Sequence, residues 1–395
     1  MGTPVFVYDE THLRARCREA RDAWGDGVAY ATKAFLCRAM AALAHEEGLC
    51  LDVSTGGELH VALSAGVPAE RLVMHGNNKS EAELAEALAV GVGRIVVDSF
   101  DEVDRLERLV AKGGQAQPPR LLIRVTPGVE AHTHEYVKTG QDDSKFGFGL
   151  ASGMADEAVS RVRAMEAKGL VRLRGIHAHI GSQIFLLESF GAEIDALAEW
   201  FSALDLDELC VGGGLGVAYV GGEEAPTITE WASMVRKACA DRGIAATVTL
   251  TAEPGRSIAA AAAVTLYTVG TIKELPGIRT YLSVDGGMSD NPRPVLYGSG
   301  YEAFLPRAVD ARRNRTVTIV GKHCESGDVL VPDARLPEDT TVGDILATPV
   351  TGAYGQSMAS NYNKVGRPPV VFVAGGRSRV VVRRETYDDL LRLDA

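Results

Sequence analysis

The chain has 395 residues, of which 46% are hydrophobic, and a formal net charge of −11 at pH 7. This length suffices for two domains, since one barrel of about 250 residues would leave room for a second core. The acidic balance argues against a nucleic-acid partner, which would require a basic patch.

The six cysteines are scattered without a C-x-x-C pair, which favours reduced thiols over a disulfide framework or a zinc knuckle. The first residues show no basic region followed by an apolar core, so we expect no signal peptide. No apolar run approaches the roughly 20 residues that span a bilayer. We therefore expect a cytoplasmic protein with no membrane partner.

An opening strand, Pro4–Tyr8, is followed by a helix over Thr11–Ala23 that Asp9 can cap. An alternation of strands and amphipathic helices then begins. Eight strands over about 230 residues favour an α/β fold, a closed (β/α)8 barrel of the TIM type over residues 24–262. The predicted strands are Val28–Thr32, Leu49–Val53, Leu72–Met74, Arg94–Val97, Leu121–Val125, Gly175–Ile180, Leu209–Val211 and Thr247–Ala252.

The pattern changes from Ala263 onward, where β-like runs follow one another without helices between them. This predicts a C-terminal all-β domain over residues 263–395, resembling a β-sandwich or β-barrel. Residues 1–23, with the opening strand, could join it. The predicted strands are Val264–Ile272, Arg279–Val284, Thr316–Val320, Asp328–Val331, Val370–Ala374 and Arg379–Arg384.

Lys33 directly follows the first predicted barrel strand. Barrel enzymes place their chemistry at the C-terminal ends of the strands, and a lysine amine there can condense with a carbonyl group. The alternative is a solvated surface lysine, the usual environment of this residue type. Lys79, which follows the third strand at a greater distance, is a rival candidate.

Two loops lie where barrels commonly bind phosphate, after the seventh and eighth strands. The first is Gly212–Gly216 and the second begins Glu253-Pro254-Gly255-Arg256. Glycines let backbone N–H groups approach an anion closely. A phosphate site together with Lys33 suggests pyridoxal phosphate, and Glu253 could then face the pyridine nitrogen. Alternatively, Glu253 and Arg256 form a structural ion pair.

His177 and His179 lie near the end of the sixth predicted strand, and alternation along the strand should point both rings into the barrel. One ring could stack on a cofactor. The pair could also bind a metal with His132 and His134, as in metal-dependent amidohydrolases, whose H-x-H pair lies on the first strand instead. Two core histidines are the third possibility. We expect no metal.

Ten segments in chain order resemble the diaminopimelate decarboxylase family of alanine-racemase-like (fold type III) pyridoxal phosphate enzymes. The resemblance covers almost the whole chain. One departure is that this chain starts almost directly at its first strand, whereas family members often carry an extra N-terminal segment. We expect this difference to affect stability or assembly rather than chemistry. The matching segments begin at Tyr30 (YATKAF), Leu51 (LDVSTGGEL), His75 (HGNNKS), His179 (HIGSQ), Gly212 (GGG), Glu253 (EPGR), Asp285 (DGGM), Arg293 (RPVLYG), Cys324 (CESGD) and Gly352 (GAYG).

The resemblance implies the cofactor, pyridoxal 5'-phosphate, and a set of site residues. The catalytic residues would be Lys33, Cys324, His179 and Glu253. The cofactor would be bound by Lys33, Asp52, His179, Ser182, Gly214, Glu253, Gly255, Arg256 and Tyr354. The substrate would be bound by Arg256, Arg293, Tyr297, Glu325 and Tyr354. Arg124 would lie near the cofactor, and Cys324 and Glu325 would come from the partner subunit of a homodimer.

The implied reaction is decarboxylation of meso-2,6-diaminopimelate to L-lysine and CO2, the last step of lysine biosynthesis. The distal end of this substrate carries both an ammonium and a carboxylate group. Glu325 complements the first, and Arg256 with Arg293 complements the second. Related alternatives are decarboxylases of other basic amino acids or polyamine precursors. A metal-dependent barrel hydrolase and a non-catalytic pyridoxal-phosphate-binding protein are more distant ones. Alanine racemases place an arginine at the ring nitrogen, so Glu253 argues against racemisation.

Overall fold

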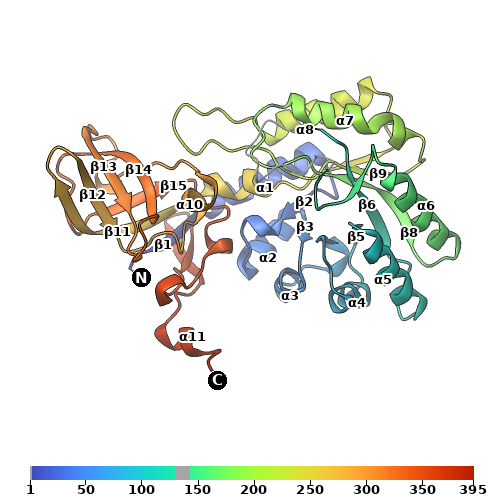
Figure 1. The fold of residues 1–395 in the computed structure, drawn as a ribbon, viewed down its shortest axis with the longest axis horizontal. Helices are drawn as coiled ribbons and strands as arrows, with labels where there is room; N and C mark the ends of the chain where they lie inside the picture. The colour runs from blue at the N-terminus through green and yellow to red at the C-terminus, as the bar shows by residue number, and fades with distance from the viewer. Residues whose placement is uncertain (1, 130–142) are drawn as a thin grey trace. The chain divides into compact units, whose positions relative to one another are not determined.

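The computed structural model describes residues 2–129 and 143–395. Two compact units make up the chain, and each is described here by itself (Figure 1). The barrel unit comprises Arg16–Gly216 and Ala225–Ser257. The β unit comprises Met1–Ala15, Val217–Glu224 and Ile258–Ala395.

In the described part of the barrel unit, eight parallel strands follow one another in chain order and a short ninth strand pairs with one of them, which confirms the predicted (β/α)8 architecture. Two hydrogen bonds connect the first strand to the segment after the last: the N–H groups of Ala29 and Ala31 donate to the carbonyls of Ala252 (3.0 Å) and Pro254 (3.2 Å). The strands are β2 (Ala29–Ala31), β3 (Cys50–Val53), β4 (Leu72–Met74), β5 (Arg94–Val97), β6 (Arg120–Thr126), β8 (Arg172–Ala178), β9 (Glu208–Cys210) and β10 (Thr249–Thr251), with short β7 (Phe148–Gly149) beside β6.

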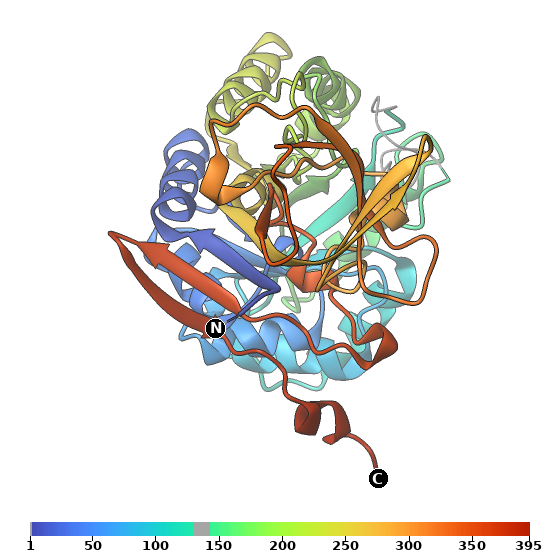
Figure 2. The same cartoon turned by 90° about the vertical axis from the view of Figure 1, so that its left-hand side faces the viewer.

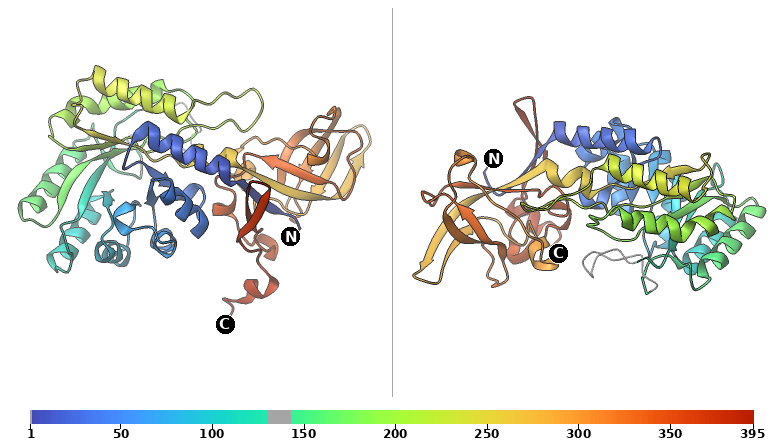
Figure 3. Two further views of the ribbon diagram at one scale, coloured as in Figure 1. Left: turned by 180° about the vertical axis from the view of Figure 1, so that it is seen from behind. Right: turned by 90° about the horizontal axis from the view of Figure 1, so that it is seen from above.

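Helices follow most of these strands, and polar caps begin several of them. Ser80 and Thr227 form capping boxes with Glu83 and Glu230, while Asp9 accepts the N–H of His12 at 3.1 Å. The helices are α1 (Glu10–Trp24), α2 (Arg38–Glu46), α3 (Gly56–Ser64), α4 (Glu81–Val90), α5 (Phe100–Ala111), α6 (Met154–Ala167), α7 (Glu188–Ser202), α8 (Ile228–Asp241) and the short α9 (Arg256–Ala259). Helices α7 and α8 pack side by side (Figure 3).

The β unit is built on one mixed sheet in the order β14-β13-β12-β11-β1-β16-β17, with β15 paired to β11. The first strand of the chain does join this sheet: β1 runs antiparallel to β11 and parallel to β16, so blue and red strands lie together in Figure 2. The strands are β1 (Val5–Asp9), β11 (Ala263–Leu275), β12 (Arg279–Val284), β13 (Arg315–Val320), β14 (Val329–Leu336), β15 (Ile345–Pro349), β16 (Val370–Ala374) and β17 (Arg377–Val382).

One strand of this sheet, β15, has no counterpart among the predicted strands. Its five residues end in proline and lack the β-branched run typical of a strand. Pairing with β11 is what makes it extended. Two short helices, α10 (Arg293–Tyr297) and α11 (Tyr387–Leu391), interrupt the otherwise β-rich unit. Among the described residues, no helix has the length and apolar character needed to cross a membrane.

Candidate active site

Lys33 lies in a turn of 3-10 helix, Thr32–Ala34, that immediately follows β2. Its neighbours Thr32 and Ala34 are buried, whereas the lysine itself is exposed. The hydroxyl of Thr32 donates to the carbonyl of Asp52 at 2.7 Å, which ties this turn to β3. The backbone is therefore fixed while the amine stays accessible, as covalent attachment of a cofactor requires.

The rival lysine, Lys79, occupies a different environment, since only 1% of it is exposed. Its Nζ lies 2.9 Å from Oε1 of Glu102 and donates to the carbonyls of Gly76 (2.6 Å) and Val96 (2.8 Å). Three oxygen atoms therefore surround this ammonium group, which has three hydrogens to donate. Lys79 supports the loop after β4 and offers no available amine.

Glu253 follows β10 and is 7% exposed. Its Oε1 lies 2.8 Å from Nε2 of His75, and its Oε2 lies 3.0 Å from Nε2 of His177. Burial by itself raises the pKa of this carboxyl, but the two imidazoles outweigh that effect and hold the pKa well below its usual range. The result is a buried carboxylate that stays ionised.

The groups around Glu253 carry different protonation states. Burial lowers the pKa of His177 to about 4, so this ring is neutral near pH 7. Burial also lowers the pKa of His75, but the charges of Asp52 and Glu253 outweigh burial and raise this pKa overall. Burial raises the pKa of Asp52 to about 6, and its Oδ1 lies 3.7 Å from Nε2 of His75. Both shifts favour the protonated forms of His75 and Asp52.

Glu253 is not paired with Arg256, the alternative that the sequence left open. Both of its carboxylate oxygens are hydrogen-bonded to histidines instead. Arg256 instead donates from Nη2 to the hydroxyl of Ser182 at 2.9 Å. Two residues predicted to lie at the cofactor therefore meet directly, Ser182 from the loop after β8 and Arg256 from the start of α9.

His179 lies one residue beyond β8, which ends at Ala178, so it belongs to a loop rather than to the predicted strand. The N–H of Gly213 donates to its Nδ1 at 3.1 Å. Burial, followed by the positive charges of Lys33 and Arg124, lowers the pKa of His179 well below its usual value. The ring is therefore neutral, which suits stacking on another planar ring.

The glycine loop after β9 is built on close backbone approach. Gly212 and Gly214 have φ values of +61° and +107°, which favour glycine. A Cβ on Gly212 would lie 2.8 Å from Nδ1 of His179, and one on Gly255 would lie 2.9 Å from the Cβ of Ala31. Side chains at these positions would fill the space between the ends of β2, β8 and β10.

Arg124 lies on β6, and its Nη1 atom is 3.3 Å from Oδ2 of Asp98. The other oxygen of Asp98 accepts the N–H of Gly147 at 2.6 Å. Sequence reasoning assigned no role to Asp98 or His75. Both could have been found, since each directly follows a predicted strand, at the end of the barrel where chemistry is expected.

Two of the predicted substrate residues, Tyr297 and Tyr354, lie in the β unit around a third, the buried Arg293. Arg293 donates from Nε to the hydroxyl of Tyr301 at 3.0 Å and from Nη2 to Ser299 at 2.9 Å. Its guanidinium carbon lies 5.6 Å from the ring of Tyr297 and 5.9 Å from the ring of Tyr354. The partners that hold Arg293 in place are neutral hydroxyl groups, so they do not neutralise its positive charge.

Cys324 and Glu325 are also in the β unit, in the loop that follows β13, and both are exposed. The other five cysteines are buried. Of the six thiols, that of Cys324 is accordingly the one available to a substrate.

Metal-type donors do occur in the barrel unit, since one ligand atom each from His75, His177 and Glu253 lies within 4.8 Å of the other two. This set differs from the one considered above, in which His177 joined His179, His132 and His134. Of those, His132 and His134 lie outside the described residues. In the structure the two imidazoles are hydrogen-bonded to the carboxylate itself.

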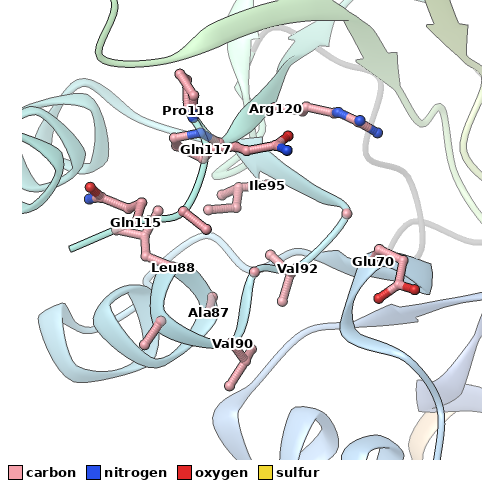
Figure 4. Close-up of a pocket in the computed structure, with 15 residues that line it drawn as sticks. Glu70, Ala87, Leu88, Val90, Val92, Ile95, Gln115, Gln117, Pro118 and Arg120 are labelled. Carbon is pink, nitrogen blue, oxygen red and sulfur yellow. The ribbon is translucent and has the colours of Figure 1, made fainter. Parts of the chain in front are cut away.

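A separate cavity of about 280 Å³ lies at the N-terminal ends of β5 and β6, and its lining is drawn in Figure 4. Lys33 and Glu253 follow the opposite, C-terminal ends of their strands. Apolar side chains dominate the lining of the cavity, which includes Leu88, Val90, Val92, Ile95 and Pro118. This end of a barrel contributes to stability rather than to chemistry.

The chain matches the family model described as "Pyridoxal-dependent decarboxylase, pyridoxal binding domain" over residues 10–260. It is 47% identical to the diaminopimelate decarboxylases of Mycobacterium tuberculosis (strain ATCC 25618 / H37Rv) and Bacillus subtilis (strain 168), over 412 and 407 residues, covering 100% of this chain and 91% of each relative.

Solved structures give the same result. A diaminopimelate decarboxylase from Helicobacter pylori, complexed with L-lysine, has a TM-score of 0.88 at 30% identity, with 100% of this chain and 97% of that chain covered. One from M. jannaschii has a TM-score of 0.91 at 30% identity, covering 100% and 92%. The chain belongs to the pyridoxal-dependent decarboxylases and, within them, to the diaminopimelate decarboxylase family.

Proposed function

We propose that this protein is a pyridoxal-phosphate-dependent decarboxylase that converts meso-2,6-diaminopimelate to L-lysine and CO2, the last step of lysine biosynthesis. The observation that carries the proposal is the buried, ionised Glu253 between His75 and His177, in the barrel whose first strand leads to Lys33. Relatives named for this activity match the chain over its full length.

The residues present fit the cofactor. Glycines at 212, 214 and 255 keep side chains out of the space around the strand ends, and Ser182 and Arg256 converge there. Asp52 has a buried Oδ1 with no hydrogen-bond partner among the described residues. When bound, pyridoxal phosphate supplies a protonated ring that accepts the electron pair left by bond cleavage at the substrate α-carbon.

The chain's own residues would divide the work of holding that cofactor. The Lys33 amine would attach it covalently, and Glu253 would keep the ring nitrogen protonated. His179, neutral because of burial, would stack on one face of the ring. The phosphate would be held by Ser182, Gly214, the backbone of Gly255 and Arg256, and Tyr354, while Asp52 would lie near the ring through its contact with His75.

The distal end of the substrate carries an ammonium and a carboxylate, so its site needs charges of both signs. Arg256 and Arg293 would bind the carboxylate, and Glu325 would bind the ammonium. Tyr297 and Tyr354, near Arg293, would complete this site. A bare amine at this end, as in lysine or ornithine, would leave Arg293 without its partner, which disfavours the alternative substrates.

We further propose a homodimer in which Cys324 and Glu325 of one subunit complete the site of the other. Exposure of both side chains supports this arrangement, because neither is buried within its own unit. The carbon that loses CO2 must gain a proton, and the Cys324 thiol is a group that can donate one.

The direct test is to incubate the purified holoenzyme with meso-diaminopimelate and to measure CO2 and lysine, with L-lysine and L-ornithine as competing substrates. We expect lysine and CO2 in equal amounts and little turnover of the two competitors. Equal or faster decarboxylation of L-lysine or L-ornithine would contradict the proposed substrate.

A further inference from the structure

The loop that carries Cys324 is anchored by Asp328, which is itself buried. The Asp328 carboxylate accepts the N–H of His323 at 2.9 Å and, from a second loop, the N–H of Met288 at 2.6 Å. A Cβ on Gly287 would lie 2.6 Å from Oδ2 of Asp328, so glycine leaves room for the carboxylate. Two segments of the family-like sequence, DGGM and CESGD, thus meet through one carboxylate.

A third segment reaches the same loop through Asn363. The Oδ1 atom of Asn363 accepts the backbone N–H of Cys324 at 3.2 Å and lies 3.2 Å from Nδ1 of His323. Because an amide oxygen can only accept, Nδ1 of His323 carries the hydrogen. The opposite ring atom, Nε2, lies 2.8 Å from the hydroxyl of Ser289. His323 is accordingly fixed on both sides, directly beside Cys324.

The backbone at Asn363 is left-handed, with φ +51° and ψ +25°. Asparagine tolerates this region better than most residues, but the conformation still costs energy. Such conformations persist where the surrounding structure requires them, often at functional sites. Here the conformation occurs in the residue whose side chain binds the N–H of Cys324.

We infer that Asn363 is a positioning residue, which fixes the backbone of Cys324 and Glu325 so that their exposed side chains meet the substrate. The inference rests on the proposed function, in which these two side chains act on the substrate. Within the part of the chain that the structure describes, the Glu325 carboxylate accepts only from its own loop, from the N–H of Gly327 (3.3 Å) and the hydroxyl of Ser326 (3.4 Å). These contacts orient the side chain relative to the loop, so the loop backbone itself must be held in advance. The two contacts of the Asn363 amide supply that restraint.

The hydrogen bond itself can be tested without measuring activity. Asn363→Gly removes the acceptor but permits the left-handed backbone, and Asn363→Asp keeps an acceptor oxygen. Lys364→Gly is the matched control, because Lys364 also has a positive φ, +55°, one residue further on. We expect faster amide hydrogen exchange in the peptide covering residues 321–328 for Asn363→Gly only.

If Asn363 positions the two side chains, its replacement should also slow the reaction. In the holoenzyme we expect Asn363→Gly to reduce kcat/KM for meso-diaminopimelate about tenfold, which corresponds to about 1.4 kcal/mol. Asn363→Asp should recover most of this loss. In a Glu325→Gln background, Asn363→Gly should reduce kcat/KM by a smaller factor, because the carboxylate that it would misplace is already absent.

Unchanged exchange in Asn363→Gly would overturn the inference, because the restraint would then not exist in solution. Faster exchange without a loss of kcat/KM would also overturn it, since the loop would then be held without serving the substrate. Both results leave the proposed function intact. Near-native turnover of Glu325→Gln alone would instead overturn the proposed role of Glu325, and this inference with it.

Discussion

The Oε1 atom of Glu253 lies 2.8 Å from Nε2 of His75, although 178 residues separate them in the chain. Asp52 and Glu253 raise the pKa of His75 against the effect of burial, which favours the protonated form of this ring. The two imidazoles in turn hold the pKa of Glu253 well below its usual range, so its carboxylate stays ionised although it is buried. A partner of a protonated ring nitrogen needs this property.

Replacing Glu253 should damage the reaction more than cofactor binding. Glu253→Gln should retain the cofactor, measured by its absorption spectrum, and slow decarboxylation about a hundredfold or more, the usual cost of losing a strong contact in a dry site. His75→Gln should cost less, because His177 still contacts the carboxylate. Near-native turnover of Glu253→Gln would remove this role.

Borohydride reduction of the holoenzyme should label a peptide that contains Lys33, whose amine is accessible. Lys79 is the matched lysine. Lys79→Met should leave Glu102 buried without its ion-pair partner and lower the free energy of unfolding by about 3–5 kcal/mol. Lys33→Met should leave stability almost unchanged but abolish labelling. Label on Lys79 would refute the assignment of Lys33.

Arg293→Ala should keep the cofactor spectrum and reduce kcat/KM for meso-diaminopimelate about a hundredfold, as expected for loss of one buried charge partner. Arg312→Ala, at an exposed position of the same unit, is the control and should match the wild type. Steady-state kinetics with both variants decide the question. If Arg293→Ala uses diaminopimelate normally, the distal carboxylate is bound elsewhere.

Subunit mixing tests the shared site. Lys33→Ala and Cys324→Ala chains should each be inactive, but a mixed dimer would contain one site with both residues intact. Random exchange should restore up to about a quarter of wild-type activity, since about half of the dimers are mixed and each has one intact site of two. Failure to recover activity despite demonstrated exchange would mean that each chain builds its own site.

Glu193 predicts a pH-dependent stability. It is fully buried in α7, and neither carboxylate oxygen has a hydrogen-bond partner among the described residues. Burial raises its pKa well above the usual value. The unfolded chain therefore releases this proton first as the pH rises above about 4.5, so folding loses stability with increasing pH.

Glu193→Met should consequently unfold at a higher temperature than the wild type, by the equivalent of about 1–3 kcal/mol, and the gain should grow as the pH rises above about 4.5. Glu199→Met, an exposed position on the same helix, serves as the control and should show neither effect. A pH-independent difference would show that Glu193 does not remain protonated.

The strand ends of the barrel could be predicted from sequence, because short apolar runs and the glycines after them are local features. Lys33, the glycine loop after β9 and Glu253 were therefore placed at the correct ends of the strands. Even so, the predicted bounds of β8 were wrong by two or three residues, which moved His179 from a strand into a loop. Strand β15 was missed because its extended form depends on pairing with β11.

The partners of these side chains were decided only by the tertiary structure. Barrel closure brings the ends of β4, β8 and β10 together, so Glu253 pairs with His75 and His177 rather than with its neighbour Arg256. In the sequence, Lys79 differs from Lys33 only in its greater distance from the end of its strand, and burial beside Glu102 is what removes it as a candidate. A sequence specifies which groups lie at strand ends, but hydrogen bonds between residues far apart form only when packing brings those ends within about 3 Å.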